Sequence, residues 1–265
     1  MTWFEAFILG LIQGLTEFIP ISSSGHLELG AAFFGLEEEN LTFSIIVHGA
    51  TFLSILVVFR KDIASLISSL FSFRWNDETK FILLLLLSAV PVAIAGLFFK
   101  EDIEKFFEGN VLFVGLMMLI TALMLFLTKF AKPQNGNVTF FKAIMIGVAQ
   151  TLAVLPGISR SGATISTALY LGIDKEKATR FSFLMVLIPI FGASFLEVLT
   201  LSKQGTGSEL SIAPLIIGAI AAFMAGLFAC SWMIKIVKKG KIFYFSAYCL
   251  VIGVIAIILG YYNIV

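Results

Sequence analysis

Residues 13–26 read Gln-Gly-Leu-Thr-Glu-Phe-Ile-Pro-Ile-Ser-Ser-Ser-Gly-His, a polar stretch with apolar sequence on both sides. Residues 150–164 form a second such stretch, Gln-Thr-Leu-Ala-Val-Leu-Pro-Gly-Ile-Ser-Arg-Ser-Gly-Ala-Thr. Each combines hydroxyl groups, glycine, proline and an ionisable side chain in one short segment. We refer to them as the first and the second motif, and the interpretation of the chain depends on them.

The two motifs match each other, because identical residues recur at an interval of 137 positions. The pattern indicates an internal repeat with halves of about 1–135 and about 138–265, within a single membrane domain that covers 1–265. The matching residues are Gly10, Gln13, Leu15, Ile21, Ser22, Ser24 and Gly25 in the first half, and Gly147, Gln150, Leu152, Ile158, Ser159, Ser161 and Gly162 in the second.

The composition indicates that most of the surface faces lipid. Of the 265 residues, 59% are hydrophobic and 13% are charged, whereas a soluble domain carries about 25% charged residues. The net charge of +1 gives no reason to expect a nucleic-acid partner. Cys230 and Cys249 lie inside apolar runs, so we interpret them as small buried side chains and not as a disulfide or metal pair.

Six apolar runs are long enough to cross a hydrocarbon core, which takes about 20 helical residues. We expect helices, because lipid offers no water to unpaired backbone groups. The six runs are approximately Leu41–Phe59, Phe81–Phe99, Val111–Phe130, Phe181–Thr200, Ile212–Ile234 and Ile242–Ile264.

Two further apolar regions, about 3–35 and about 139–172, are each interrupted near the middle by a motif. Their halves are too short to span, so we expect re-entrant helical hairpins whose irregular backbone is buried in protein or lines a wet cavity. Three spans after each hairpin would make the second hairpin enter from the opposite face. The predicted fold is therefore an all-α polytopic membrane protein with an inverted-topology repeat, six transmembrane helices and two re-entrant hairpins.

The basic residues of the loops predict the orientation. Alternate loops hold 14 of the lysines and arginines, and the other loops hold three, with one arginine left inside the second motif. Basic loops face the cytoplasm. The segments that we expect there are 60–80, 129–142, 175–180 and 235–241.

The second motif has the composition of a phosphate site. An arginine at membrane depth is costly and indicates function, and the planar guanidinium of Arg160 suits bidentate hydrogen bonds to phosphate. Gly157 and Gly162 allow close approach of the backbone to a ligand. A half-helix beginning after Gly162 would direct amide donors at an anion. A simpler role for Arg160, which is compatible with this one, is an ion pair with Glu17.

The first motif offers groups for catalysis. Glu17 can act as a base or bind a hard cation, and Gln13 lies one helical turn before it on the same face. Mg²⁺ binds through carboxylate and phosphate oxygens, so Glu17 with a diphosphate would make such a site. Ser22, Ser23 and Ser24 are candidate nucleophiles or helix caps. His26 can transfer a proton or hold a fixed hydrogen bond.

His48 is the other histidine of the chain. Because it lies inside an apolar run, we expect it to make a structural hydrogen bond.

At these residues the sequence resembles the undecaprenyl-diphosphate phosphatase family, also called the bacitracin-resistance proteins. The resemblance covers nearly the whole chain in length, motif order and repeat. It implies hydrolysis of undecaprenyl diphosphate in the bacterial plasma membrane, which recycles the lipid carrier of peptidoglycan. It also implies six spans, two re-entrant units and a divalent cation (Mg²⁺ or Ca²⁺). The partners that we expect are the polyprenyl diphosphate substrate and membrane lipids. The sequence leaves homodimer formation open.

The resemblance also assigns roles to residues. It places the family's catalytic serine on Ser23, its histidine on His26 and its arginine on Arg160, with Glu17 and Gln13 in the metal motif. Many members carry glutamate where this chain has Gln13, so the metal site has one carboxylate fewer here. The hydroxyls of Ser22, Ser24, Ser159 and Ser161 match those around the diphosphate in the family. The other candidates for substrate binding are Gly25, Gly157, Gly162 and Thr164.

Two other membrane-protein functions share features with this sequence. Membrane phosphatidate phosphatases need a histidine six residues after the arginine, where this chain has Ser166, and an upstream Lys-x₆-Arg-Pro that is absent from the sequence. A transporter or flippase of a phosphorylated lipid would suit the inverted repeat. A carrier alone, however, needs neither the base Glu17 nor the nucleophile Ser23.

Overall fold

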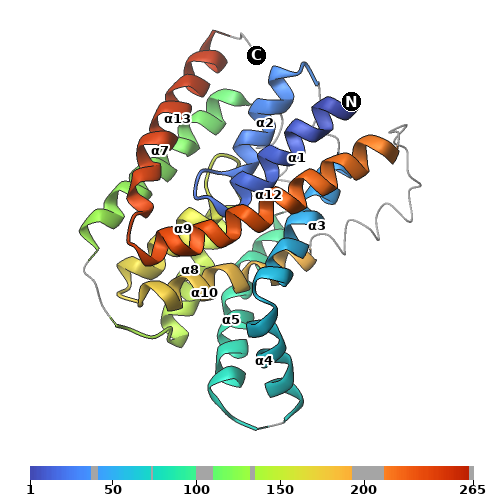
Figure 1. Cartoon of the computed structure of the whole chain (residues 1–265). Coiled ribbons are helices and arrows are strands. Elements are labelled where there is room, and N and C mark those ends of the chain that lie inside the picture. Colours follow the sequence, from blue (N-terminus) through green and yellow to red (C-terminus); the bar gives the residue numbers. More distant parts are fainter. Residues whose placement is uncertain (37–40, 73, 100–109, 132–134, 193–211, 263–265) are drawn as a thin grey trace.

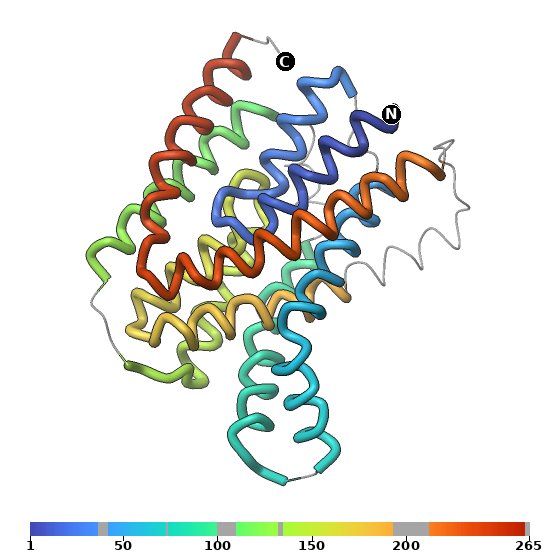
Figure 2. The backbone as a smooth tube through the Cα atoms, in the orientation of Figure 1, coloured from blue at the N-terminus to red at the C-terminus, as the bar shows by residue number. Residues whose placement is uncertain are grey.

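The computed structural model is an assembly of helices (Figures 1 and 2). It describes residues 1–36, 41–72, 74–99, 110–131, 135–192 and 212–262. Within these ranges the secondary structure is helical apart from one isolated β-bridge between Gly136 and Ile173. The first half contains α1 Trp3–Phe18, α2 Ser23–Phe33, α3 Leu41–Val58, α4 Arg60–Phe71, α5 Asp77–Phe98, α7 Val111–Leu127 and η2 Thr128–Phe130. The second half contains α8 Phe140–Leu152, α9 Arg160–Tyr170, α10 Lys175–Met185, α12 Ile212–Lys238, η3 Ile242–Tyr244 and α13 Phe245–Tyr261.

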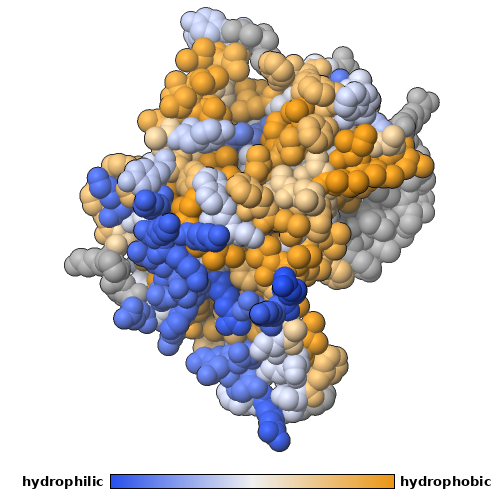
Figure 3. Space-filling model, viewed as in Figure 1, coloured by the Kyte–Doolittle hydropathy of each residue, from blue (hydrophilic) through white to orange (hydrophobic). Residues whose placement is uncertain are grey.

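Four helical segments of the described chain are long and apolar enough to cross a membrane. They are Asp77–Phe98, Val111–Phe130, Ile212–Lys238 and Ile242–Tyr261. Their outward faces are apolar: Leu97 is 71% and Leu123 is 58% exposed, and Figure 3 shows hydrophobic residues over much of the visible face. Such exposure requires lipid as the solvent, so the chain is a multi-pass, all-α membrane protein.

The remaining two expected spans differ from straight helices. The run from Leu41 continues past α3 into α4 through a bend of 79°, and α4 itself was not predicted. In the run Phe181–Thr200, α10 ends at Met185 and a turn at Val186 follows. Residues 193–200 of that run lie outside the described residues. The count of six spans and their orientation in a membrane therefore stay predictions.

Each motif lies at the turn between two helices, as the sequence predicted. In the first, α1 and α2 are joined by residues 19–22, and in the second, α8 and α9 are joined by residues 153–159. The helix after the second motif begins at Arg160 and not after Gly162. The reason is that Ser159 caps α9 by accepting the amide hydrogen of Gly162.

The two halves contact each other reciprocally. Helix α1 of the first half packs on α12 of the second, and α8 of the second half packs on α5 of the first. Gly10 lies against the backbone of Gly218, and its repeat equivalent Gly147 lies against the backbone of Ser88. A Cβ atom at Gly10 would lie 2.4 Å from the Gly218 carbonyl oxygen, so only glycine permits this approach. The close packing places the two motifs between the halves.

The four basic segments lie together, as their predicted location on one face requires. Contacts centred on α10 and the residues beside it join them: Arg180 to Asp62 at 2.6 Å, Lys238 to Glu176 at 3.2 Å, and Lys177 to Asn137. Figure 3 shows hydrophilic residues gathered toward the end where the α12–η3 connection and α10 lie. These contacts show that the four segments lie close together, whereas the membrane face on which they lie stays a prediction.

Candidate functional site

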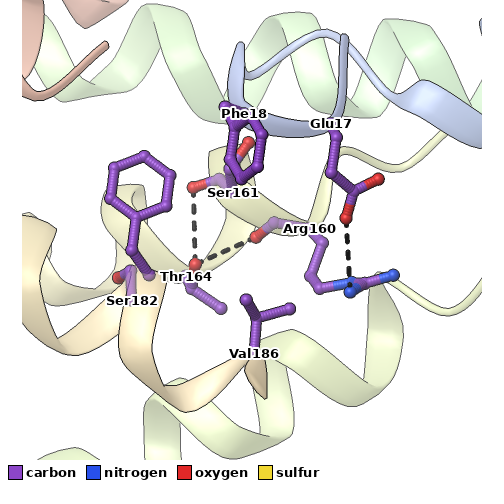
Figure 4. Close-up of a pocket in the computed structure, with 8 residues that line it drawn as sticks. Glu17, Phe18, Arg160, Ser161, Thr164, Ser182 and Val186 are labelled. Atoms are coloured by element: carbon purple, nitrogen blue, oxygen red, sulfur yellow. Dashed lines mark hydrogen bonds and ion pairs between the residues drawn. The ribbon is translucent and has the colours of Figure 1, made fainter. Parts of the chain in front are cut away.

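The two motifs meet at their turns, and Glu17 and Arg160 face each other there (Figure 4). The Arg160 Nη1 atom lies 3.6 Å from Glu17 Oε1. The Ser161 hydroxyl donates to the Ile19 carbonyl at 3.4 Å, which ties the second motif to the turn of the first. Glu17 is 5% exposed and the Arg160 side chain is 32% exposed, so the pair lies at the edge of the protein interior.

Glu17 accepts two hydrogen bonds at one oxygen of its carboxylate. Its Oε2 atom accepts a hydrogen bond from the Ser23 hydroxyl at 2.7 Å and another from Gln13 Nε2 at 3.0 Å. Gln13 lies one turn earlier on α1, so the same helix supplies the carboxylate and the amide that orients it. A hydroxyl that donates to a buried carboxylate is the arrangement of a nucleophile beside its base.

His48 also faces this carboxylate, with Nε2 3.9 Å from Glu17 Oε2. Its Nδ1 atom lies 2.9 Å from the Ser44 carbonyl oxygen, so the predicted structural hydrogen bond is confirmed. Sequence reasoning missed the proximity to Glu17, because it depends on how α3 packs beside α1.

Ser23 is the first residue of α2, and Ser22 is the cap of that helix. The Ser22 hydroxyl accepts the Gly25 amide hydrogen at 3.3 Å and lies 3.4 Å from the Ser24 hydroxyl. The cap role proposed as the simpler alternative for these serines therefore applies to Ser22. The Ser23 hydroxyl donates to Glu17 instead.

His26 lies three residues after Ser23 on α2, and its ring contacts other groups than Glu17. Its Nδ1 atom is 2.8 Å from the Ser22 carbonyl oxygen, and its Nε2 atom is 2.8 Å from the Tyr248 hydroxyl. The sequence allows His26 either to transfer a proton or to hold a fixed hydrogen bond. These contacts correspond to a fixed hydrogen bond.

The second motif is held on α7 by Thr121. Its hydroxyl accepts the Ser159 amide hydrogen at 3.0 Å and donates to the Gly157 carbonyl at 3.0 Å. Gly157 has φ of +94°, and a Cβ atom there would lie 2.4 Å from the Val114 carbonyl oxygen. Close contact with a helix, more than with a ligand, thus explains this glycine.

The remaining residues of the second motif surround the start of α9. Ser159 and Ser161 hydroxyls lie 3.3 Å apart, and the Thr164 hydroxyl donates to the Arg160 carbonyl at 3.0 Å. Glu17, Arg160, Ser161 and Thr164 line a pocket (Figure 4). Phe18, Ser182, Phe183 and Val186 complete its wall.

Two buried polar atoms beside Glu17 lack a hydrogen-bond partner. One is Arg160 Nη1 and the other is Gln13 Oε1. Unpaired buried polar atoms are costly unless a ligand satisfies them. Arg160 Nη1 is ion-paired with Glu17 Oε1 at 3.6 Å without a hydrogen bond, so the guanidinium can still donate to an anion. The Gln13 amide oxygen beside a carboxylate suits an oxygen-binding cation. Within the described residues, no cluster of three or more His, Cys, Asp or Glu side chains forms a self-sufficient metal site.

A family model described as bacitracin resistance protein BacA matches residues 6–255. This chain belongs to the bacitracin resistance protein family. The undecaprenyl-diphosphatase of Christiangramia forsetii is 53% identical to it over 264 residues, covering 98% of this chain and 99% of the relative. Proteins of the same name from Bacteroides fragilis and Carboxydothermus hydrogenoformans are 50% and 42% identical, each over 98% of this chain and at least 98% of their own length.

Proposed function

We propose that this chain is a phosphatase of the plasma membrane that hydrolyses undecaprenyl diphosphate to undecaprenyl phosphate and inorganic phosphate. Relatives named undecaprenyl-diphosphatase align with this chain over nearly their full length. The observation that carries the proposal is the hydrogen bond from the Ser23 hydroxyl to the Glu17 carboxylate at 2.7 Å, next to Arg160, whose Nη1 atom makes an ion pair but no hydrogen bond. The product would re-enter the cycle of peptidoglycan synthesis as lipid carrier.

In the first step, the Ser23 Oγ atom bonds to the terminal phosphorus while the bond from that phosphorus to the bridging oxygen breaks. The serine proton passes to Glu17, which returns it to the departing oxygen of undecaprenyl phosphate. In the second step, water attacks the phosphoserine and its proton passes through Glu17 to Oγ, so inorganic phosphate leaves. Direct attack by water activated at Glu17 would give the same products.

Arg160 binds the phosphate oxygens in this mechanism. Its guanidinium offers donors in a planar fork, and charge on the equatorial oxygens increases during the transfer. The amide groups at the start of α9 add positive potential beside it. The ion pair with Glu17 at 3.6 Å orients the fork before substrate binds.

A divalent cation, Mg²⁺ or Ca²⁺, fits the pair Glu17 and Gln13. Glu17 supplies a carboxylate, and Gln13 supplies the buried Oε1 atom that lacks a partner. When bound, the cation would neutralise phosphate charge, with the remaining ligands coming from the diphosphate and water. Because the site has one carboxylate, we expect the cation to bind weakly without substrate.

The test is release of labelled phosphate from undecaprenyl diphosphate by purified protein, with a rapid acid quench that captures label on the protein. Wild type should release phosphate and carry label, and Ser23→Ala should be slower by about 10⁴-fold and carry none. Ser72→Ala is the matched control, because Ser72 is an exposed serine after α4. Full-rate release from Ser23→Ala would exclude the serine step. Tight substrate binding with no release from wild type would favour a carrier.

A further inference from the structure

The ring of His26 is held between the two halves of the chain. Its Nε2 atom lies 2.8 Å from the hydroxyl of Tyr248, which is on α13 and 222 residues later. The two rings are also stacked, with centroids 5.6 Å apart and planes inclined by 11°. On the other side of the ring, Nδ1 lies 2.8 Å from the Ser22 carbonyl oxygen. Both nitrogen atoms are therefore engaged by groups other than Glu17.

The partners determine where the ring proton lies. A carbonyl oxygen can only accept, so Nδ1 carries the proton and donates it to Ser22. In the neutral ring Nε2 is then an acceptor, and the Tyr248 hydroxyl must be the donor. The hydrogen bonds run in one direction, from Tyr248 through His26 to Ser22, and select a single tautomer.

The end of this path is a strained residue. Ser22 has φ of +70° and is the sole described non-glycine residue with positive φ. Such a conformation is strained for a residue with a side chain and persists only where surrounding contacts enforce it. The Ser22 carbonyl is held by His26, and the Ser22 hydroxyl is held by the Gly25 amide. Ser23, which contacts Glu17, is the next residue.

We propose that Tyr248 is a positioning residue of the site, which acts through His26 to hold the Ser22 turn and so keeps the Ser23 hydroxyl on Glu17. His26 in this arrangement is a bridge that keeps its proton on Nδ1, and α13 of the second half controls the nucleophile of the first. The kinetic part of this inference rests on the proposed phosphatase function, whereas the tautomer does not.

The tautomer is measured by nitrogen NMR of protein labelled with ¹⁵N-histidine. The chain has two histidines, so His48→Gln assigns both rings. Wild-type His26 should show protonated Nδ1 and a hydrogen-bonded acceptor at Nε2. Tyr248→Phe keeps the stacked ring but removes the hydroxyl donor. The ¹⁵N chemical shift of Nε2 should therefore move to that of a nitrogen that accepts no hydrogen bond. Identical His26 signals in both proteins would overturn the proposal, whatever the enzyme's activity.

The kinetic test uses the same variant. Tyr248→Phe should lower kcat about tenfold and leave KM unchanged, because the lost hydrogen bond positions the nucleophile and does not bind substrate. Tyr244→Phe is the control, since Tyr244 is 62% exposed on η3 and should behave as wild type. Unchanged kcat in folded Tyr248→Phe would refute the positioning role. An inactive wild type with the expected NMR signals would instead refute the phosphatase function.

Discussion

Thr121→Val should destabilise the protein more than its small chemical change suggests. The side chain is 2% exposed and its hydroxyl satisfies two backbone groups of the second motif, the Ser159 amide and the Gly157 carbonyl. Valine has nearly the same shape, so packing against the motif is retained. What changes is that one donor and one acceptor are left buried without partners.

The expected magnitude follows from that pair of groups. Each buried polar group without a partner costs about 1–3 kcal/mol, so Thr121→Val should cost roughly 2–6 kcal/mol. Thr128→Val is the matched control on the same helical segment. The Thr128 hydroxyl donates to the Leu125 carbonyl, which also accepts the backbone amide hydrogen of residue 128. The carbonyl therefore stays satisfied in the control, and the cost should be about 1 kcal/mol.

The assay is thermal unfolding of both variants in one detergent, with phosphate release measured below the transition. At about 2–4 °C per kcal/mol for a chain of this size, Tm of Thr121→Val should be at least about 2 °C below that of the control. Phosphate release should also fall, because the displaced loop carries Arg160. Equal Tm values and equal turnover would show that Thr121 does not hold the second motif.

Two further predictions concern the residues that face Glu17. Arg160→Lys should lower kcat/KM by about a hundredfold, because an ammonium group cannot replace the two-pronged contact of guanidinium with phosphate; near-normal phosphate release would rule out the clamp. Gln13→Glu should make activity depend more steeply on added Mg²⁺ after EDTA treatment, because it places a second carboxylate where Nε2 now lies 3.0 Å from Glu17 Oε2. An unchanged Mg²⁺ titration would place residue 13 outside the cation's ligands.

The features predicted correctly follow from the apolar and charged composition of each segment. The apolar runs predicted α5, α7 and α12 to within a few residues, because lipid imposes helix on any segment of that length. The meeting of Glu17 and Arg160 could also be predicted, since two costly polar stretches at membrane depth lower their cost by contacting each other. The loop charges grouped the four basic segments, and the structure places these segments close together.

The features that were missed depend on packing between distant segments. Thr121 and Tyr248 lie in apolar helices, and a single hydroxyl there gives no indication of which loop or ring it will contact. Arg60 and Lys61, which begin α4, made residues 60–71 look like part of a basic loop. The identity of its partner, α5, is visible only in the structure.

The repeat explains how one fold produces an asymmetric site. Ser23 and Arg160 lie 137 positions apart, so they occupy equivalent positions, and each is the first residue of the helix that follows its motif. The structure thus directs the starts of two helices toward the place where the motifs meet, and both starts favour an anion. Symmetry alone would build a binding site for phosphate. The proposed catalysis needs the difference between the halves: a serine hydroxyl at one helix start, a guanidinium at the other, and a carboxylate, Glu17, whose repeat equivalent is Val154.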